Sequence, residues 1–235
     1  MENVSTATAT LEANVATDDW TFAGANTRQL THCYHDYPAR MIPQIAGKLL
    51  DRFAGPRSMM FDPYCGSGTT LVEGMIRDHR VVGADLNPLA RLISEAKTTQ
   101  IPFKNLDRAI ERFAALDLTR GDRAFAPAGL RDLEFWFQPR VVDALCAARV
   151  FIATVTPRSV RRFFEVAFSE TVRDCSNTRN DEFKLYRLPA DQLAQFAPDV
   201  RATMLRKLTR NRTGVVDLMA YFDRIAPEGA GLYEH

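Results

Sequence analysis

Residues 61–70 read FDPYCGSGTT and carry the strongest chemical signal in the chain. Gly66 and Gly68 allow a sharp backbone turn and let N–H groups approach a ligand without a Cβ in the way. Asp62 precedes the glycines, and a second acid, Asp85, lies 17 residues after Gly68. An acid at that spacing can accept hydrogen bonds from both hydroxyls of a ribose, and the carboxylate of Asp62 favours a cationic group. The pattern predicts a site for a positively charged nucleoside.

Three ligands can be compared with this turn. A P-loop for ATP requires G-x-x-x-x-G-K-[ST], and no lysine follows Gly68. A dinucleotide fingerprint requires a third glycine, where this chain has Leu71. A ribose that carries an ammonium and a sulfonium group describes S-adenosylmethionine, which suits both acids. A tight strand-to-helix turn without a ligand is the alternative.

The residues around the turn predict the elements that position it. Residues 58–62 read as a short buried strand, 69–78 as a helix and 80–85 as a second strand. Asn87 as N-cap and Pro88 at the first helical position start another helix. The order strand, glycine turn, helix, strand and helix opens a Rossmann-like, doubly wound α/β sheet.

Composition divides the chain into three regions. Residues 1–17, rich in Ala, Thr and Asn, predict a flexible tail, with a short helix as the alternative. Residues 18–104 hold the predicted sheet and a helix that begins at Pro43 and ends before Gly55. Residues 105–235 read as mainly helical. We therefore expect an incomplete sheet followed by a helical extension.

The overall numbers exclude several classes of protein. The chain has 235 residues, 46% hydrophobic and 25% charged, with a net charge of +1, as in soluble globular proteins. No apolar run approaches the roughly 18 residues of a membrane span, and the start, with Glu2, is not a signal peptide. The four cysteines form no CxxC pair, which is typical of reduced thiols in the cytoplasm. His32, Cys33 and His35 lie close together, but no further pair completes a metal site, so we predict none.

The motif FDPYCGSGTTLVEG, followed by VVGADLNPLA, resembles the cofactor half of the DNA amino-methyltransferases, which methylate N4 of cytosine or N6 of adenine. The family's first motif has Phe where this chain has Tyr64. The resemblance is strong over residues 32–98, and residues 163–187 look like a segment of some members. It implies an S-adenosylmethionine-dependent DNA methyltransferase of the restriction–modification or a related type, without indicating which of the two bases is the target.

The resemblance also implies the cofactor contacts. The segment HDYPARMIPQIA would close over the methionine end through Tyr37, Pro38, Ala39 and Arg40. The glycine turn would wrap the methionine and ribose through Asp62, Pro63, Tyr64, Cys65, Gly66, Ser67, Gly68 and Thr69, with the small size of the cysteine mattering more than its thiol. Asp85 would hold the ribose, with Leu86 and Asn87 beside the adenine.

The family's catalytic motif is missing from this chain. Its members flip the target base out of the helix and hold the amine with a Ser/Asp/Asn-Pro-Pro-aromatic motif. The chain has 12 prolines, no two of them adjacent, and no Pro-Cys pair for cytosine-C5 chemistry. The catalytic residues are therefore unassigned. We expect this chain to be an N-terminal portion or a split subunit of a longer methyltransferase and to be inactive alone. The catalytic half would then lie outside these 235 residues, in the same polypeptide or in a second one. A non-catalytic subunit that binds cofactor and DNA, and an RNA or small-molecule methyltransferase, are the alternatives.

The second half of the chain carries a local positive charge. Residues 158–212 contain 12 Lys and Arg against 7 Asp and Glu. Residue types that reach phosphates or base edges form two groups, Arg173, Asn177, Arg179 and Asn180, and then Arg206, Lys207 and Arg210 on a helix expected to end at Gly214. As a group they predict a DNA-facing surface; a solvated helix face is the alternative for each residue. Phe135, Trp136 and Phe137 favour a core or subunit interface over a base-stacking platform.

Overall fold

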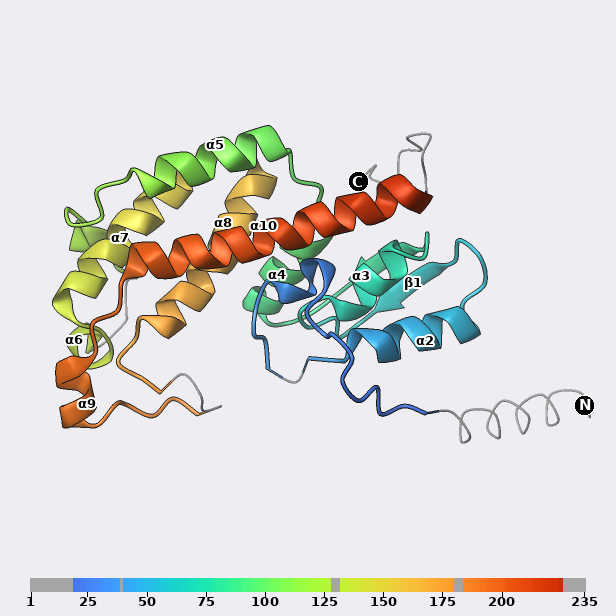
Figure 1. The fold of residues 1–235 in the computed structure, drawn as a ribbon, viewed down its shortest axis with the longest axis horizontal. Helices are drawn as coiled ribbons and strands as arrows, with labels where there is room; N and C mark the ends of the chain where they lie inside the picture. Colours follow the sequence, from blue (N-terminus) through green and yellow to red (C-terminus); the bar gives the residue numbers. More distant parts are fainter. Residues whose placement is uncertain (1–18, 39, 128–131, 180–183, 226–235) are drawn as a thin grey trace, which may run out of the picture.

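The computed structural model describes residues 19–38, 40–127, 132–179 and 184–225, with side chains as far as residue 220. A small α/β part lies at one end and a group of longer helices at the other, and α10 (Val200–Ile225) runs along both (Figure 1). The predicted tail, residues 1–17, lies outside the described residues. The fold is mixed α/β, as predicted.

Two parallel strands form the sheet. β1 (Met59–Asp62) pairs with β2 (Arg80–Gly83), and their carboxyl ends meet at one edge. α3 (Thr69–Met75) connects the strands, beginning at the predicted residue. β2 ends two residues before the predicted strand does, because the chain there turns toward the loop after β1. The Ala84 carbonyl accepts a hydrogen bond from the Cys65 amide at 3.0 Å.

The predicted starts of two helices are confirmed. α2 (Pro43–Phe53) begins at its proline and ends before the Gly-Pro pair. α4 (Pro88–Thr98) follows Asn87, whose Oδ1 accepts a hydrogen bond from the Leu89 amide at 2.9 Å. A capping side chain and a proline act within one turn of the helix, so these boundaries do not depend on distant contacts.

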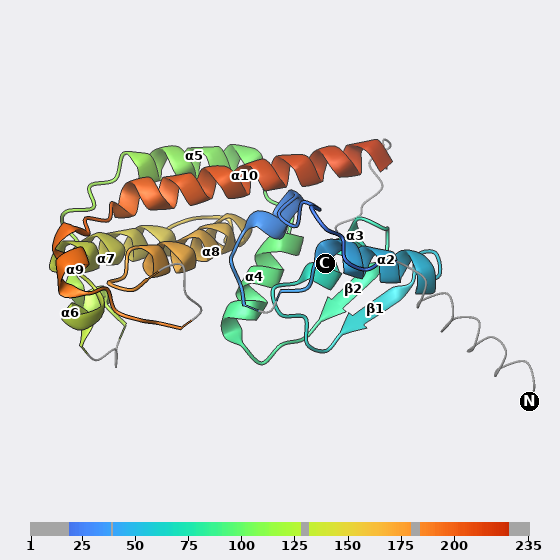
Figure 2. The same ribbon diagram turned by 60° about the horizontal axis from the view of Figure 1, so that its bottom comes forward.

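The two faces of the sheet are covered unequally. Val81 packs under Gly74 of α3, where a Cβ would lie 2.6 Å from the valine Cγ1. The opposite face carries Met59, Phe61 and Val82, which are 69%, 64% and 48% exposed. Figure 2 shows α2 and α3 on one side of the strands and no described helix on the other. A doubly wound sheet has helices on both faces, whereas among the described residues only one face of this sheet is covered.

The other elements are helices around one apolar core. They are η1 (Leu30–Cys33), α5 (Phe103–Ala114), η2 (Arg123–Phe125), α6 (Leu133–Trp136), α7 (Pro139–Ala153), α8 (Arg158–Asp174) and α9 (Ala190–Gln195). Tyr34, Phe113, Phe163 and Phe164 are fully buried, and Ile93 of α4 belongs to the same core. The core therefore joins α4 to the long helices. None of the helices in the described part of the chain is long and apolar enough to cross a membrane.

The aromatic residues that begin the helical region divide between core and surface. Phe137 is buried in the core, which agrees with one of the two predicted roles. Phe135 is 44% exposed, with the Arg187 guanidinium 4.5 Å from its ring centroid. Its ring also contacts Trp136 edge-on at 4.8 Å. These contacts fix the chain where it enters α7.

The predicted end of the last helix at Gly214 is wrong. α10 continues through this residue to Ile225. A Cβ at position 214 would lie 2.3 Å from the Leu30 carbonyl oxygen and 2.8 Å from Cys33 Sγ. The glycine therefore allows η1 to approach α10 closely. Glycine is a common helix terminator, but here tertiary packing requires it inside a helix.

Candidate cofactor-binding site

The glycine turn connects β1 to α3 at the carboxyl edge of the sheet. Gly66 and Gly68 have φ values of +50° and +76°, so the expected need for glycine is confirmed. A Cβ at Gly68 would also lie 2.8 Å from Cβ of Ser94. This glycine therefore serves the packing of the turn against α4, a role that the motif alone does not reveal.

Asp85 joins the two loops at this edge. Its Oδ2 accepts a hydrogen bond from the Gly66 amide at 2.9 Å, and its Oδ1 accepts one from the Asn87 amide at 2.8 Å. Each carboxylate oxygen has a second lone pair, so both can still accept a bond from a hydroxyl. The predicted ribose acceptor thus lies beside the glycine turn. Asp62, at the end of β1, accepts a bond from the Tyr64 amide at 3.0 Å.

The segment before α2 reaches the same edge. The Tyr37 hydroxyl accepts a hydrogen bond from Asn87 Nδ2 at 3.0 Å, and the Tyr37 ring lies 3.7 Å from where a Cβ of Gly66 would be. Arg40 instead binds its own segment, donating to the carbonyls of His32 and His35 at 2.9 and 3.3 Å. Burial is the main cause of the lowered pKa of Arg40.

The remaining predicted contacts differ in exposure. Ser67 and Thr69 are buried, and their hydroxyls have no hydrogen-bond partner within the described residues. Buried hydroxyls normally have one, so these two mark positions that a ligand or water would satisfy. Tyr64 and Leu86 are 85% and 98% exposed. Pro38 and Pro63 are exposed as well, and Ala39 lies outside the described residues.

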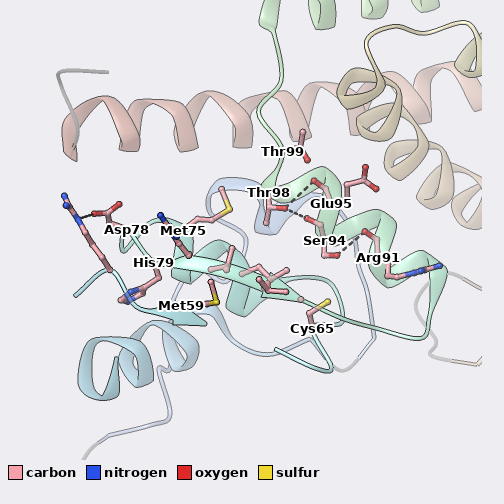
Figure 3. Close-up of a pocket in the computed structure, with 16 residues that line it drawn as sticks. Met59, Cys65, Met75, Asp78, His79, Arg91, Ser94, Glu95, Thr98 and Thr99 are labelled. Atoms are coloured by element: carbon pink, nitrogen blue, oxygen red, sulfur yellow. Dashed lines mark hydrogen bonds and ion pairs between the residues drawn. The ribbon is translucent and has the colours of Figure 1, made fainter. Parts of the chain in front are cut away.

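An open cleft of about 1400 Å³ runs along β2 beside α4 (Figure 3). Its lining includes Cys65, Gly83, Arg91, Ser94 and Glu95. Cys65 is the residue that this cleft shares with the predicted cofactor contacts. Burial raises the pKa of the Cys65 thiol, which does not favour a nucleophilic role. The cleft follows the free edge of the sheet, whereas the predicted contacts gather at its carboxyl end.

The predicted DNA-facing residues do not form one surface. Asn177 is buried and donates from Nδ2 to the Phe135 carbonyl at 3.2 Å. Lys207 is buried, with Nζ 2.7 Å from Asp174. It lies on the inward face of α10, because Met204 and Asn211 lie one helical turn away and are fully buried.

The other members of the two groups lie in different environments. Arg210 is partly buried and donates to Glu170 at 2.5 Å. Arg179 and Arg206 are exposed, Arg173 is partly buried, and Asn180 lies outside the described residues. Among the described members, the exposed side chain of the first group is Arg179 and that of the second group is Arg206.

The roles of two buried acids were not predicted from the sequence. Glu73 of α3 is 2.9 Å from His32 Nε2 and 2.6 Å from Arg77 Nη1, so it ties η1 to the helix after the glycine turn. Glu170 of α8 is 4% exposed. An acid among apolar residues on a helix, as in TTLVEGMI, is the signal that could have revealed Glu73.

The chain is similar to curated methyltransferases. It is 37% identical over 214 residues to the Type II methyltransferase M.MvaI of Kocuria varians. This alignment covers 87% of this chain and 47% of that protein. It is 32% identical over 104 residues to the Type II methyltransferase M.MjaII of Methanocaldococcus jannaschii, covering 44% of this chain and 18% of that protein. No family model and no solved structure matches. The chain thus spans about half the length of M.MvaI and a smaller part of M.MjaII. Over that span its resemblance to the methyltransferases is confirmed.

Proposed function

We propose that this chain is the cofactor-binding part of an S-adenosylmethionine-dependent DNA methyltransferase that modifies N4 of cytosine or N6 of adenine. One observation carries the proposal. The Asp85 carboxylate lies at the carboxyl edge of two parallel strands and binds both the glycine turn and Asn87, which in turn binds Tyr37. The similarity to Type II methyltransferases over 87% of the chain supports the same activity.

The residues at this edge suit the proposed cofactor. The Asp85 oxygens keep free lone pairs for ribose hydroxyls, and Asp62 supplies negative charge for the ammonium and sulfonium groups. The unpartnered hydroxyls of Ser67 and Thr69 fit a polar ligand beside the turn. The exposed Leu86 side chain offers an apolar surface to the adenine. The cofactor would supply an electrophilic methyl group, while these residues bind and orient it.

We also propose that the described sheet is part of a Rossmann-like, doubly wound sheet completed by other polypeptide. The bare face of Met59, Phe61 and Val82, and the cleft beside β2, support this proposal. The missing Pro-Pro-aromatic motif would lie on that polypeptide, in the same chain or in a second subunit. A non-catalytic subunit remains the second candidate, favoured by the absence of adjacent prolines.

DNA contact and location in the cell complete the proposal. Arg179 and Arg206, both exposed, support weak contact with phosphates. All four cysteines are buried and free of disulfides, which is consistent with a reducing compartment such as the cytoplasm.

Calorimetric titration tests the cofactor proposal directly. We expect the purified chain, shown to be folded by circular dichroism, to bind S-adenosylmethionine and to bind ATP and NAD much more weakly. A folded chain that binds none of the three would contradict the proposed function. Tighter binding of NAD would indicate that the turn accepts a dinucleotide despite Leu71.

A further inference from the structure

An ion pair in the helical region holds the backbone just before Tyr37. Glu170 Oε1 accepts a hydrogen bond from the Asp36 amide at 3.0 Å, across 134 positions of sequence. Arg210 Nη2 donates to the Tyr34 carbonyl at 3.0 Å and to Glu170 Oε2 at 2.5 Å. α8 and α10 therefore hold two peptide groups of this short segment through one pair of charged side chains.

Further contacts reinforce the same segment. Asn211 Nδ2 donates to the Tyr34 carbonyl at 3.3 Å, and His35 Nε2 lies 3.3 Å from Ser169 Oγ. These contacts matter because no helix or strand is assigned over residues 34–38. Side chains from distant helices replace the backbone hydrogen bonds that would otherwise hold such a stretch.

The burial of Glu170 restricts where its carboxylate can lie. A buried carboxylate is costly unless it is paired and hydrogen-bonded. Arg210 supplies the charge and Lys207 Nζ lies 3.5 Å away, while the Asp36 amide satisfies the other oxygen. Because few alternatives would satisfy this carboxylate, its position and that of the segment are fixed together.

The segment connects the ion pair to the candidate site. Tyr37 directly follows the held peptide groups, and its hydroxyl accepts from Asn87. Asn87 in turn donates its amide to Asp85, which holds Gly66. We infer that Glu170 and Arg210 are positioning residues that hold the Tyr37 segment in the conformation required to bind cofactor. This inference rests on the proposed function, since it assigns the two residues to the same site. Holding the segment before binding reduces the cost of ordering it when the cofactor arrives.

Conservative substitutions test the inference. Glu170→Gln keeps an oxygen for the Asp36 amide but loses the charge, whereas Glu170→Ala loses both. We expect S-adenosylmethionine affinity to fall several-fold in Glu170→Gln and more than tenfold in Glu170→Ala, with Arg210→Gln between them. The graded order distinguishes positioning of the segment from a general loss of stability.

α10 offers a matched control. Arg212, two residues after Arg210, forms a bidentate ion pair with Asp107 of α5 at 2.6 and 2.9 Å and lies over the Phe103 ring, away from the Tyr37 segment. Arg212→Gln should change cofactor affinity less than twofold. Equal losses in Arg210→Gln and Arg212→Gln would overturn the inference.

Hydrogen exchange provides a readout that does not depend on cofactor. Amides of residues 34–37 should exchange faster in Glu170→Gln than in the wild type, and at the wild-type rate in Arg212→Gln. Unchanged exchange in Glu170→Gln would overturn the inference even if affinity fell. Conversely, faster exchange in Glu170→Gln, together with a wild-type chain that binds no cofactor, would locate the failure in the proposed function and not in the ion pair.

Discussion

The helical region and the small sheet differ in how completely they bury their apolar residues. In the helical region Phe113, Phe163 and Phe164 are fully buried and contact one another at ring-centroid distances of 6.1 and 6.4 Å. In the sheet Phe61, a residue of the same type, is 64% exposed on a face that no described helix covers. Phenylalanine side chains therefore lie in different environments within one chain. Among the described residues the helical core is therefore enclosed, whereas one face of the sheet is left uncovered.

The largest expected effect concerns catalysis. We expect the chain alone to transfer no methyl group to DNA, because the groups that would hold a flipped base and its amine are missing. Adding the polypeptide that corresponds to the remaining part of M.MvaI, fused or separate, should restore transfer to an exocyclic amine. Tritiated cofactor with mixed-sequence DNA, followed by nucleoside analysis, measures this.

The bare face of the sheet supplies a control for that experiment. Phe61→Glu should prevent restoration while leaving cofactor affinity nearly unchanged, since the side chain is largely exposed in this chain. Methylated base produced by the 235-residue chain alone would show that the catalytic site lies within it.

The next effect compares the two regions through stability. Phe163→Ala removes a fully buried ring and should lower the free energy of unfolding by about 3–5 kcal/mol. Phe61→Ala removes an exposed ring and should change it by about 0.5 kcal/mol or less. Urea titrations followed by circular dichroism measure both. Similar losses in the two variants would mean that the sheet face is covered in solution.

The third effect concerns the carboxyl edge of the sheet. Asp85→Ala should weaken S-adenosylmethionine binding by more than tenfold, about 1.5–3 kcal/mol, because a charged acceptor and the link to Gly66 are lost together. Calorimetry gives the affinity. Asp78→Ala, which removes an exposed pair with Arg57 near the opposite end of β2, is the control and should leave affinity unchanged. Equal affinities in both variants would exclude Asp85 as a cofactor contact.

The fourth effect is found where the two regions meet. Lys97 of α4 is 1% exposed, its Nζ has no hydrogen-bond partner within the described residues, and it lines a small cavity with Thr31 and Tyr34. Burial lowers its pKa to about 7, and the charge of Arg40 contributes. Between this value and the usual 10.5, the unfolded chain binds a proton that the folded chain does not, so this lysine makes stability rise with pH.

Lys97→Met should therefore be more stable than the wild type at pH 7, and the difference should shrink by about 2 kcal/mol as the pH rises to 9. Urea titrations at pH 7, 8 and 9 measure it. Comparing the two proteins at each pH cancels the titration of other groups, such as the buried cysteines. A difference that stays constant with pH would show that Lys97 keeps its charge in the folded chain.

The smallest expected effect concerns DNA. The chain should bind DNA weakly and with strong salt dependence, because phosphate contacts provide affinity without reading sequence. Reversing Arg179 and Arg206 to Glu should weaken binding several-fold and lower the salt slope by about 2. Fluorescence anisotropy with labelled duplex at several salt concentrations measures this. Binding that does not depend on salt would count against a phosphate-facing surface.

Local signals in the sequence gave the most accurate predictions. Pro43, Asn87 and Pro88 set helix starts within a single turn, and the structure has them where they were predicted. The glycines of the turn were likewise assigned the unusual backbone that they have. In each case the residue restricts its own φ or accepts a hydrogen bond from a nearby backbone amide, so the local structure does not depend on distant contacts.

Long-range contacts explain what the sequence did not predict. The predicted basic group on α10 follows from charge alone, but Lys207 faces inward because α8 supplies Asp174 and Glu170. The role of Glu170 at Asp36 depends on residues 134 positions apart, which no local pattern reveals.

Gly214 sets a limit on which residues the long helix can accept. Within an exposed helix, alanine is better than glycine by about 1 kcal/mol, so an isolated peptide of this sequence would gain helicity from the exchange. In the folded chain the added methyl group would meet the Leu30 carbonyl oxygen at 2.3 Å and push η1 away from α10. η1 leads directly into the Tyr37 segment, so displacing η1 would also displace the segment that lies beside the glycine turn. The helix therefore tolerates its least favourable residue short of proline at the position that packs against η1.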